Sequence, residues 1–535
     1  MRTRTYAFWL LISYIVGVLF FVIPIALFMS SSSYDGLLPI RSPDEGHYIV
    51  RMQPHLLNPF ASVPDGVWFA PTAPTWLQVS LIEYVGGSLF AWTGLSALQV
   101  SWLLMVLLAP LSIPIVALLA RRCGCHQMCS LCIGGTLFII MREFARMFHP
   151  SISFPLTALT LLTMWMWWDT PRVSRSIIAG ALSGMLVGVY LWSWTFVCAV
   201  WGCLFLVSIV IREERMKHLR VLPFVAVSAL LTASPALWMS YSVSQLSMFA
   251  ESADRMGLLL SRELESPIRS TLLLILTALT IWVLHRRRDI ARFAPLIAMQ
   301  TALLLVYNQQ LVTRRVMSFS THYYPYVCLV AILLIAFVLS HRKMGMRLWF
   351  LGIVACIPLV AAAHDYGFLS RSPFFVVQAD DTVHLRPAIE ELNAREPAVV
   401  LTDGYTGNLV GSTTAHSTLF IEYARILVIP TAEYVERYCL SEALTTGEID
   451  FAWVAYFQEE QSRVALSHTR ELYQKHWRMG QTICPDVKKH LSAMLRKYHV
   501  QYVLWNERTR PQWKLDPSLF QLQKQGEGWS LWTVK

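Results

Sequence analysis

Charged residues are scarce in this chain of 535 residues. Asp, Glu, Lys and Arg make up 15% of it, against 55% hydrophobic residues. The mean hydropathy of +0.47 is too high for a soluble globular protein. The net charge of +10 does not indicate a nucleic-acid partner, because the positive residues cluster between apolar runs rather than along one soluble face. We therefore expect an integral membrane protein that binds no nucleic acid.

A secreted disulfide framework is also missing, since most of the ten cysteines are scattered inside apolar runs. Four of them fall in CGCHQMCSLC, residues 123–132, where the spacing invites a zinc site. That block spans a predicted loop-to-helix junction, which favours ordinary buried thiols. Cys439 and Cys484 lie in the C-terminal part and could pair, a question that the sequence leaves open.

The amino terminus has no small-residue cleavage site after its first apolar run, so we expect an uncleaved first span. Segment 73–93 carries Glu83 and a Gly pair, and we expect it to lie at the membrane surface. The loops then predicted to be cytoplasmic are all basic, which places the amino terminus inside. Runs long enough to span begin near residues 7, 97, 126, 153, 176, 196, 220, 270, 291, 323 and 347.

The composition changes near residue 365. The stretches AVVLTDG, ARILVIP, FAWVAYF and VQYVLWN read as strands, 485–498 as a helix, and FQLQKQGEGWSLWTVK as a hairpin. We therefore predict an α-helical polytopic membrane domain of about eleven transmembrane helices over 1–364, with a first outer loop at 30–96. An extracytoplasmic α/β domain follows over 365–535. Asp403 and Gly404 lack a phosphate-binding glycine motif, so a simple strand-to-loop turn is favoured there.

Unusual polar residues fall on the predicted outer side of the membrane. Carboxylates and guanidiniums are costly near a bilayer unless they are solvated, paired or bound to a ligand. A wet loop with chance charges explains any one of these residues, but their combination favours a site. The candidates are Asp44, Glu45, His47, Tyr48, Arg142, Arg146, His149, Arg314, Arg315 and His322.

The stretch PDEGHY, residues 43–48, resembles the D-E-x-x-Y signature of the GT-C superfamily of membrane glycosyltransferases. That group includes protein mannosyltransferases, aminoarabinose transferases and oligosaccharyltransferases. The likeness covers roughly residues 1–240 and includes FAPTAPTWLQVSLIEYVGG, ALLARRCG and VYLWSWTFV. It implies a GT-C-like fold and transfer of a sugar from a polyprenyl-phosphate carrier to a lipid, glycan or protein acceptor on the outer face.

The resemblance also implies roles for single residues. Asp44 matches the superfamily's catalytic acidic position, and a carboxylate there can take the acceptor's proton or steady an oxocarbenium-like centre. Glu45 is its neighbour, either hydrogen-bonded to it or sharing a divalent ion (Mg or Mn) with it; no other cofactor is expected. The four arginines are expected to bind the donor phosphate. His47, Tyr48, His149 and His322 are expected to line the pocket.

One departure keeps other readings open. Several superfamily members place a second acid after the third span, where this chain has Ser151, with Glu143 as the only nearby acid. Either no metal is needed or another outer acid completes the site, with Glu251, Asp254, Glu263 and Glu265 as candidates. A non-catalytic scaffold of the same fold and a transporter or flippase of lipid-linked sugars are the alternatives. The expected location is a bacterial inner (plasma) membrane.

Overall fold

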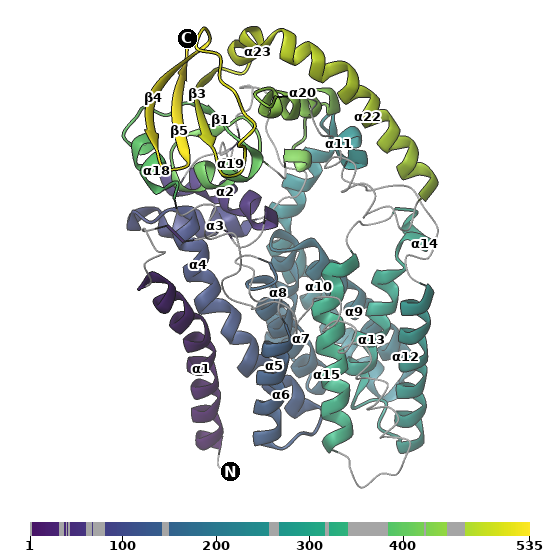
Figure 1. The fold of residues 1–535 in the computed structure, drawn as a ribbon. Helices are drawn as coiled ribbons and strands as arrows, with labels where there is room; N and C mark the ends of the chain where they lie inside the picture. The colour runs from purple at the N-terminus through teal and green to yellow at the C-terminus, as the bar shows by residue number, and fades with distance from the viewer. Residues whose placement is uncertain are drawn as a thin grey trace.

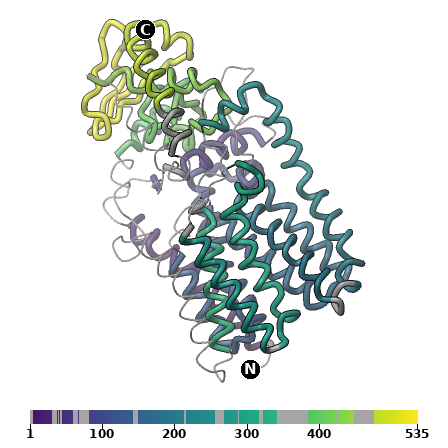
Figure 2. The backbone as a smooth tube through the Cα atoms, turned by 90° about the vertical axis from the view of Figure 1, so that its right-hand side faces the viewer, coloured from purple at the N-terminus to yellow at the C-terminus, as the bar shows by residue number. Residues whose placement is uncertain are grey.

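The chain folds into a bundle of helices and a smaller domain that contains a sheet, as seen in a computed structural model. The amino terminus lies at the far end of the bundle, and the carboxyl terminus lies in the domain at the other end (Figures 1 and 2). The structure describes residues 3–30, 37–38, 40, 43–59, 67, 81–141, 149–255, 267–315, 320–340, 384–421, 424–446 and 466–535.

The bundle consists of apolar helices. In the described part of the chain, five segments are long and apolar enough to cross a membrane: Arg4–Met29, Ala97–Arg122, Leu191–Val210, Met216–Ser244 and Ile268–Arg286. By length and composition the chain is therefore an integral membrane protein. The helices are α1 (Thr3–Met29), α4 (Ala97–Leu108), α5 (Ser112–Arg122), α6 (Gln127–Ile140), α7 (Ser153–Asp169), α8 (Val173–Met185), α9 (Leu191–Val210), α10 (Arg212–Ser244), α12 (Pro267–Arg287), α13 (Ala294–Tyr307) and α15 (Tyr324–Ser340).

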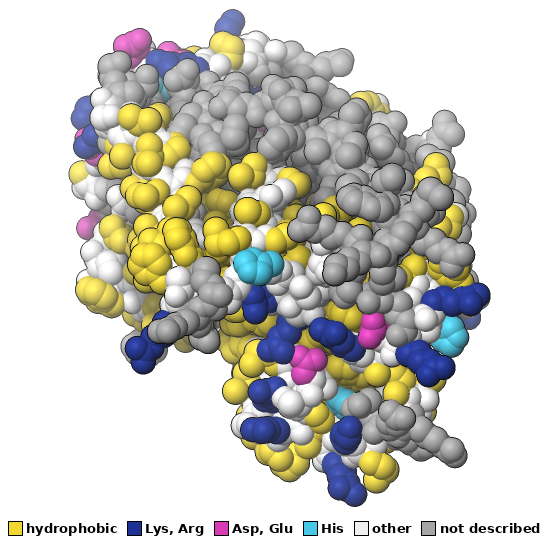
Figure 3. Space-filling view, turned by 90° about the horizontal axis from the view of Figure 1, so that it is seen from below, with side chains coloured by type: hydrophobic (Ala, Val, Ile, Leu, Met, Phe, Trp, Pro, Cys, Tyr) yellow, Lys and Arg dark blue, Asp and Glu magenta, His cyan; other side chains and the backbone are white. Residues whose placement is uncertain are grey.

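A helix stands at each of the first ten predicted spans, with the second span divided at Pro110 into α4 and α5. The eleventh, near residue 347, lies outside the described residues, so the count of eleven stays a prediction. Figure 3 looks at the end of the bundle that holds the amino terminus and shows Lys and Arg side chains gathered over part of it. Arg121 and Arg122 at the end of α5 contribute to this basic end. Its cytoplasmic location also stays a prediction.

Two short helices lie between the bundle and the sheet-containing domain. These are α2 (Pro43–Leu57) and α3 (Leu81–Phe90), both from the predicted first outer loop, and Figure 1 shows them across the upper end of α4. The spacing of polar and apolar residues makes α2 amphipathic, as a helix between two bodies should be. The described part of 73–93 thus forms a helix that packs on α2 and is not among the five long apolar segments.

The C-terminal domain is built on a five-stranded sheet of order β2-β1-β3-β5-β4. Strands β1 (Val399–Leu401), β2 (Ser417–Thr418) and β3 (Val500–Asn506) run parallel, and β4 (Phe520–Gly526) and β5 (Trp529–Val534) complete an antiparallel half. The hairpin turns at Gly528, whose φ of 76° suits glycine. The surrounding helices are α18 (Arg386–Asn393), α19 (Gly404–Thr413), α20 (Thr431–Glu442), α22 (Leu466–Lys489) and α23 (Leu491–Lys497).

The predicted strands were right in three places and wrong in one. AVVLTDG holds β1, VQYVLWN is β3, and the hairpin is present. ARILVIP is not a strand, because three of its carbonyls accept hydrogen bonds from the buried side chain of Arg255. The segment begins with the single turn η6 (Ala424–Ile426). FAWVAYF lies outside the described residues. The short strand β2 was missed.

Arg255 joins the bundle to the C-terminal domain. It ends α11 (Phe249–Arg255), the helix that follows α10. Its Nε donates to the Arg425 carbonyl (2.9 Å) and its Nη1 to the Ile429 carbonyl (3.0 Å), and its Nη2 donates to the Leu427 carbonyl. Alternate carbonyls of this segment therefore turn toward one guanidinium instead of toward a neighbouring strand.

Two further contacts tie the C-terminal domain together and to the first outer loop. A disulfide between Cys439 and Cys484 links α20 to α22, which answers the question that the sequence left open. Val67 of the predicted outer loop forms an isolated parallel bridge with Thr418 of β2 and is fully buried. The sheet of the C-terminal domain is therefore extended by a residue of the outer loop.

Candidate functional site

The helix that carries the predicted acidic pair, α2, is anchored by buried polar contacts. The guanidinium of Arg51 lies 3.5 Å from a carboxylate oxygen of Glu83 on α3, and both side chains are buried. Oε1 of Gln53 accepts a hydrogen bond from the backbone N–H of Ala97 at the start of α4 (2.8 Å). Because a buried ion pair leaves an uncompensated charge when one partner moves, these contacts fix α2 along its axis.

Close packing against α3 fixes α2 sideways. A Cβ built on Gly87 would lie 2.6 Å from Cβ of His55 and 2.9 Å from the Met52 carbonyl, so only glycine allows this approach. Burial lowers the pKa of His55, and the nearby Arg51 cation lowers it further. The Glu83 and Gly pair that marked segment 73–93 in the sequence therefore serve the contact with α2.

A cluster of rings, the outer ring cluster, brings α2 together with three other segments. Tyr48 meets His149 edge to face (4.8 Å between ring centroids). His149 stacks on Tyr190 at 4.3 Å and 13°, and Tyr190 shares a hydrogen bond between its hydroxyl and Nδ1 of His322. The members are His47, Tyr48, His149, Tyr190, Trp192 and His322. Four of the ten predicted site residues thus lie in one cluster.

The outer ring cluster rests on hydrogen-bonded tyrosines inside the bundle. The hydroxyl of Tyr323 lies 2.8 Å from Oγ1 of Thr195, and the hydroxyl of Tyr326 bonds to Oγ of Ser193. These pairs hold the start of α9 against η5 (Ser320–Tyr323) and α15. The positions of Tyr190 and His322 are therefore set by buried contacts, as a preorganised site requires.

The acidic pair lies one turn before these rings. Glu45 is 1% exposed, so its carboxylate is buried beside the outer ring cluster rather than in open water. Asp44 belongs to α2 by its backbone, but its side chain lies outside the described residues. Burial of Glu45 agrees with a site and disfavours the alternative of a wet loop with chance charges.

The predicted arginines are not joined to this cluster in the described part of the chain. Arg142 and Arg146 lie outside the described residues. Arg314 and Arg315 are exposed and follow the short helix α14 (Gln310–Thr313), which Figure 1 places on the side of the molecule away from α2. The described contacts do not link Arg314 or Arg315 to the outer ring cluster. Their role in binding phosphate stays a prediction.

The residues proposed as a second acid of the site differ in their surroundings. Glu251 accepts a hydrogen bond from the backbone N–H of Thr431 at the start of α20 (3.0 Å), so it holds the C-terminal domain. Asp254 is exposed, and Ser151 is fully buried. Glu143, Glu263 and Glu265 lie outside the described residues. A second acid that completes a site with Glu45 therefore stays a prediction.

Metal binding was tested on the donor atoms. Among the described residues, no group of three or more His, Cys, Asp or Glu side chains could hold a metal ion. A divalent ion at Asp44 and Glu45 therefore stays a prediction. None of the four cysteines at 123–132 forms a disulfide. Cys123 and Cys125 are buried, as ordinary core thiols should be, whereas Cys129 is half-buried and Cys132 is exposed.

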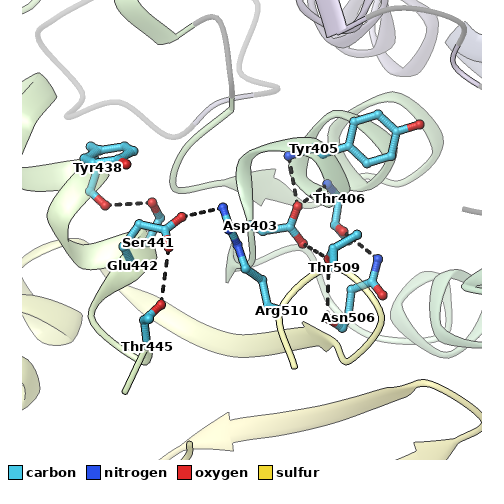
Figure 4. Close-up of polar contacts among 10 residues, drawn as sticks. All are labelled: Asp403, Tyr405, Thr406, Tyr438, Ser441, Glu442, Thr445, Asn506, Thr509 and Arg510. Carbon is cyan, nitrogen blue, oxygen red and sulfur yellow. Dashed lines mark hydrogen bonds and ion pairs between the residues drawn. The ribbon is translucent and has the colours of Figure 1, made fainter. Parts of the chain in front are cut away.

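Asp403 caps a helix in the C-terminal domain and does not open a phosphate cradle (Figure 4). Its Oδ1 accepts the backbone N–H groups of Tyr405 (3.1 Å) and Thr406 (3.0 Å), and its Oδ2 accepts from the Thr509 hydroxyl (3.2 Å). The donors that would bind an anion are thus occupied by a carboxylate. The predicted strand-to-loop turn is instead a strand-to-helix junction, because β1 ends at Leu401 and α19 begins at Gly404.

Sequence reasoning missed two members of the cluster, Tyr190 and Trp192. Both stand where α9 begins, within VYLWSWTFV, and aromatic residues at the end of a span usually read as membrane-interface anchors. Their stacking with His149 and His322 depends on residues far away in the sequence. In the sequence, only the resemblance of VYLWSWTFV to a similar run in the GT-C superfamily drew attention to this stretch.

Comparison with known proteins gives a similarity in structure only. No family model and no curated protein matches the chain. The chain is similar to the apo oligosaccharyltransferase of Archaeoglobus fulgidus, with 12% identity and a TM-score of 0.47, over 93% of this chain and 69% of that one. It is likewise similar to the A. fulgidus oligosaccharyltransferase AglB bound to an inhibitory peptide and a dolichol-phosphate (12%, 0.47, 94% and 70%).

A third similar structure is the same A. fulgidus enzyme in complex with Zn and sulfate (11% identity, TM-score 0.45, 93% and 68% coverage). Oligosaccharyltransferases are among the proteins that the motifs of this sequence resemble.

Proposed function

We propose that this protein is a membrane glycosyltransferase that moves a hexosyl or pentosyl group from a polyprenyl-phosphate carrier to an acceptor on the outer face. The observation that carries the proposal is the convergence of the acidic helix α2 with three other segments in the outer ring cluster, just above the apolar bundle. A hydrophobic polyprenyl donor can reach this position through the bilayer, and the acceptor can reach it from water.

The chemistry matches the residues at this place. A hydroxyl or amide of the acceptor attacks the anomeric carbon, and the carbon–oxygen bond to phosphate breaks with its electron pair leaving on the carrier phosphate. The acceptor loses a proton in this step, and we assign that proton to Asp44, which begins α2. A positioned base of this kind typically contributes about 10²–10⁴-fold in rate.

The neighbours of Asp44 have supporting roles in this proposal. We assign to the buried carboxyl group of Glu45 the stabilisation of the positive charge that develops at the anomeric centre in the transition state. The faces of Tyr48, Tyr190 and Trp192 offer flat apolar surface for a sugar ring. Arg142, Arg146, Arg314 and Arg315 remain the proposed phosphate ligands, since fork-shaped donors match phosphate oxygens.

The test compares the full-length protein with Asp44→Asn in proteoliposomes. The donors are polyprenyl phosphates that carry radiolabelled mannose or aminoarabinose, and the readout is label leaving the lipid phase for a membrane-extract acceptor. We expect Asp44→Asn to lower transfer by at least about 100-fold. The matched control is Asp516→Asn, the same change at a turn of the C-terminal domain, and it should leave transfer unchanged.

The two alternatives predict other results. A transporter moves the intact labelled lipid across the membrane and leaves the sugar–phosphate bond whole. A scaffold neither cleaves nor moves the donor. Equal transfer by the wild type and Asp44→Asn would remove Asp44 from the mechanism. The bacterial inner membrane and an extracytoplasmic C-terminal domain belong to the same proposal, supported by the basic end seen in Figure 3.

A further inference from the structure

The C-terminal domain touches α2 at the residue that separates Glu45 from His47. A Cβ built on Gly46 would lie 2.5 Å from Oδ1 of Asn408 and nearer still to its Cγ and Nδ2. Asn408 belongs to α19, the helix capped by Asp403. The amide group of Asn408 therefore lies directly against the backbone of α2, and a methyl group at position 46 would fit only if this buried amide moved.

This amide is buried at a cost. Asn408 is 0% exposed, and neither Oδ1 nor Nδ2 has a hydrogen-bond partner among the described residues. A buried amide without partners destabilises a contact, whereas an apolar side chain of similar size would not. The amide lies at the first turn of α2, where backbone N–H groups have no partner within the helix. Packing alone does not account for an asparagine at this position.

Asn408 and the outer ring cluster press on α2 from opposite sides. Gly46 and Tyr48 are two residues apart in a helix, so they face directions about 200° apart. Asn408 lies on the Gly46 side, and His149 lies on the Tyr48 side. A displacement of α19 would therefore push α2 toward the rings or release it from them, and Asp44 and Glu45 would move with it.

We propose that Asn408 is a positioning residue: by seating α19 on Gly46, it fixes where the first turn of α2 presents Asp44 and Glu45. The inference rests on the proposed glycosyl transfer for its kinetic consequence. Its structural consequence, docking of α19 on α2, holds whatever reaction the protein performs. The two can therefore fail separately.

The experiment is a double-mutant cycle in the full-length protein with Gly46→Ala, Asn408→Ala and the double variant. Transfer from the labelled polyprenyl-phosphate sugars gives kcat and the donor KM. We expect Gly46→Ala to lower kcat at least 10-fold with the donor KM changed less than 2-fold, because the helix shifts while the donor site stays. The double variant should recover to the kcat of Asn408→Ala, since the new methyl group occupies the vacated space.

The same variants are compared by hydrogen exchange of the α2 amides, which does not depend on activity. Gly46→Ala should speed this exchange at least 10-fold, and the double variant should restore protection. The control is Gly135→Ala on α6, where an added Cβ meets nothing within 4 Å, and it should change neither kcat nor exchange.

Two results would overturn the inference. These are full kcat and normal exchange in Gly46→Ala, or a double variant no better than Gly46→Ala in both readouts. An inactive wild type would sink the proposed function alone, and the exchange data would then decide the role of Asn408 by themselves.

Discussion

Replacing Arg255 by Met should detach the C-terminal domain locally from the bundle. The guanidinium holds three carbonyls of the segment 425–429, and it also donates to Oγ1 of Thr431 (3.0 Å) and Oγ of Ser252 (3.2 Å). Burial lowers the pKa of Arg255 to about 10, so the side chain is still a cation at neutral pH. Methionine fills a similar volume but donates no hydrogen bond.

The size of the effect follows from the groups left behind. Arg425, Leu427 and Ile429 are all buried, so each of their carbonyls would lose a hydrogen bond to a charged group without gaining water. The Leu427 carbonyl keeps the backbone N–H of Ile429 (3.0 Å), and the Ile429 carbonyl keeps the Ser252 hydroxyl (3.3 Å). A hydrogen bond to a charged group contributes about 1.5–3 kcal/mol. Relief of the cost of burying a cation offsets part of this sum, which leaves roughly 3–5 kcal/mol. Local opening should then be favoured by about two to four powers of ten.

The assay is hydrogen exchange of the full-length protein, followed at the amides of 424–431 and of α11. A whole-protein melting temperature would mix two domains and is not used. The control is Arg386→Met, because Arg386 pairs with Glu390 at the surface, where the two side chains are 45% and 63% exposed. That change should cost less than about 1 kcal/mol. Equal exchange in the two variants would refute the reasoning.

Two further predictions concern the same domain. Burial lowers the pKa of His476 to about 4 from 6.5, so the unfolded state binds more protons than the folded state between pH 4 and pH 6.5. Docking of α22 should therefore weaken by roughly 3 kcal/mol as the pH falls from 6.5 to 4. His476→Gln should flatten this exchange profile, and an unchanged profile would contradict it. The disulfide joins two cysteines 45 residues apart, so the double variant Cys439→Ala/Cys484→Ala should destabilise the domain by about 4 kcal/mol. The control Cys198→Ala removes a free thiol and should leave the stability of the domain unchanged. Unchanged hydrogen-exchange protection in the double variant would contradict the estimate.

Local patterns in the sequence predicted the elements whose cause is local. Apolar runs located the helices that stand at ten of the predicted spans, and alternating residues with a Gly turn located the hairpin β4–β5. The acidic stretch 43–48 was recognised as unusual because charge near a bilayer needs a reason. These features depend on hydrophobic period, turn chemistry and solvation, and all three can be read within a window of a few residues.

The segment 424–430 shows why other elements could not be predicted. Its apolar, β-branched residues have the composition of a buried strand, but its carbonyls are taken by Arg255, about 170 residues earlier in the chain. The place of Tyr190 in the outer ring cluster could not be predicted for the same reason, since it depends on contacts with His149 and His322. A single sequence gives no distance between such residues, so tertiary contacts override local propensity without warning.

The position of the acidic pair is itself a tertiary product. Contacts fix α2 at Gly46 by Asn408, at Tyr48 by His149, at Arg51 by Glu83, and at Gln53 by the start of α4. The first of these comes from the C-terminal domain, and Val67 of the same outer loop bridges to Thr418 there as well. Because α2 is too short to be stable alone, we expect these contacts together to set its place. The C-terminal domain, which holds no predicted catalytic residue, therefore contributes to where the first turn of α2 lies.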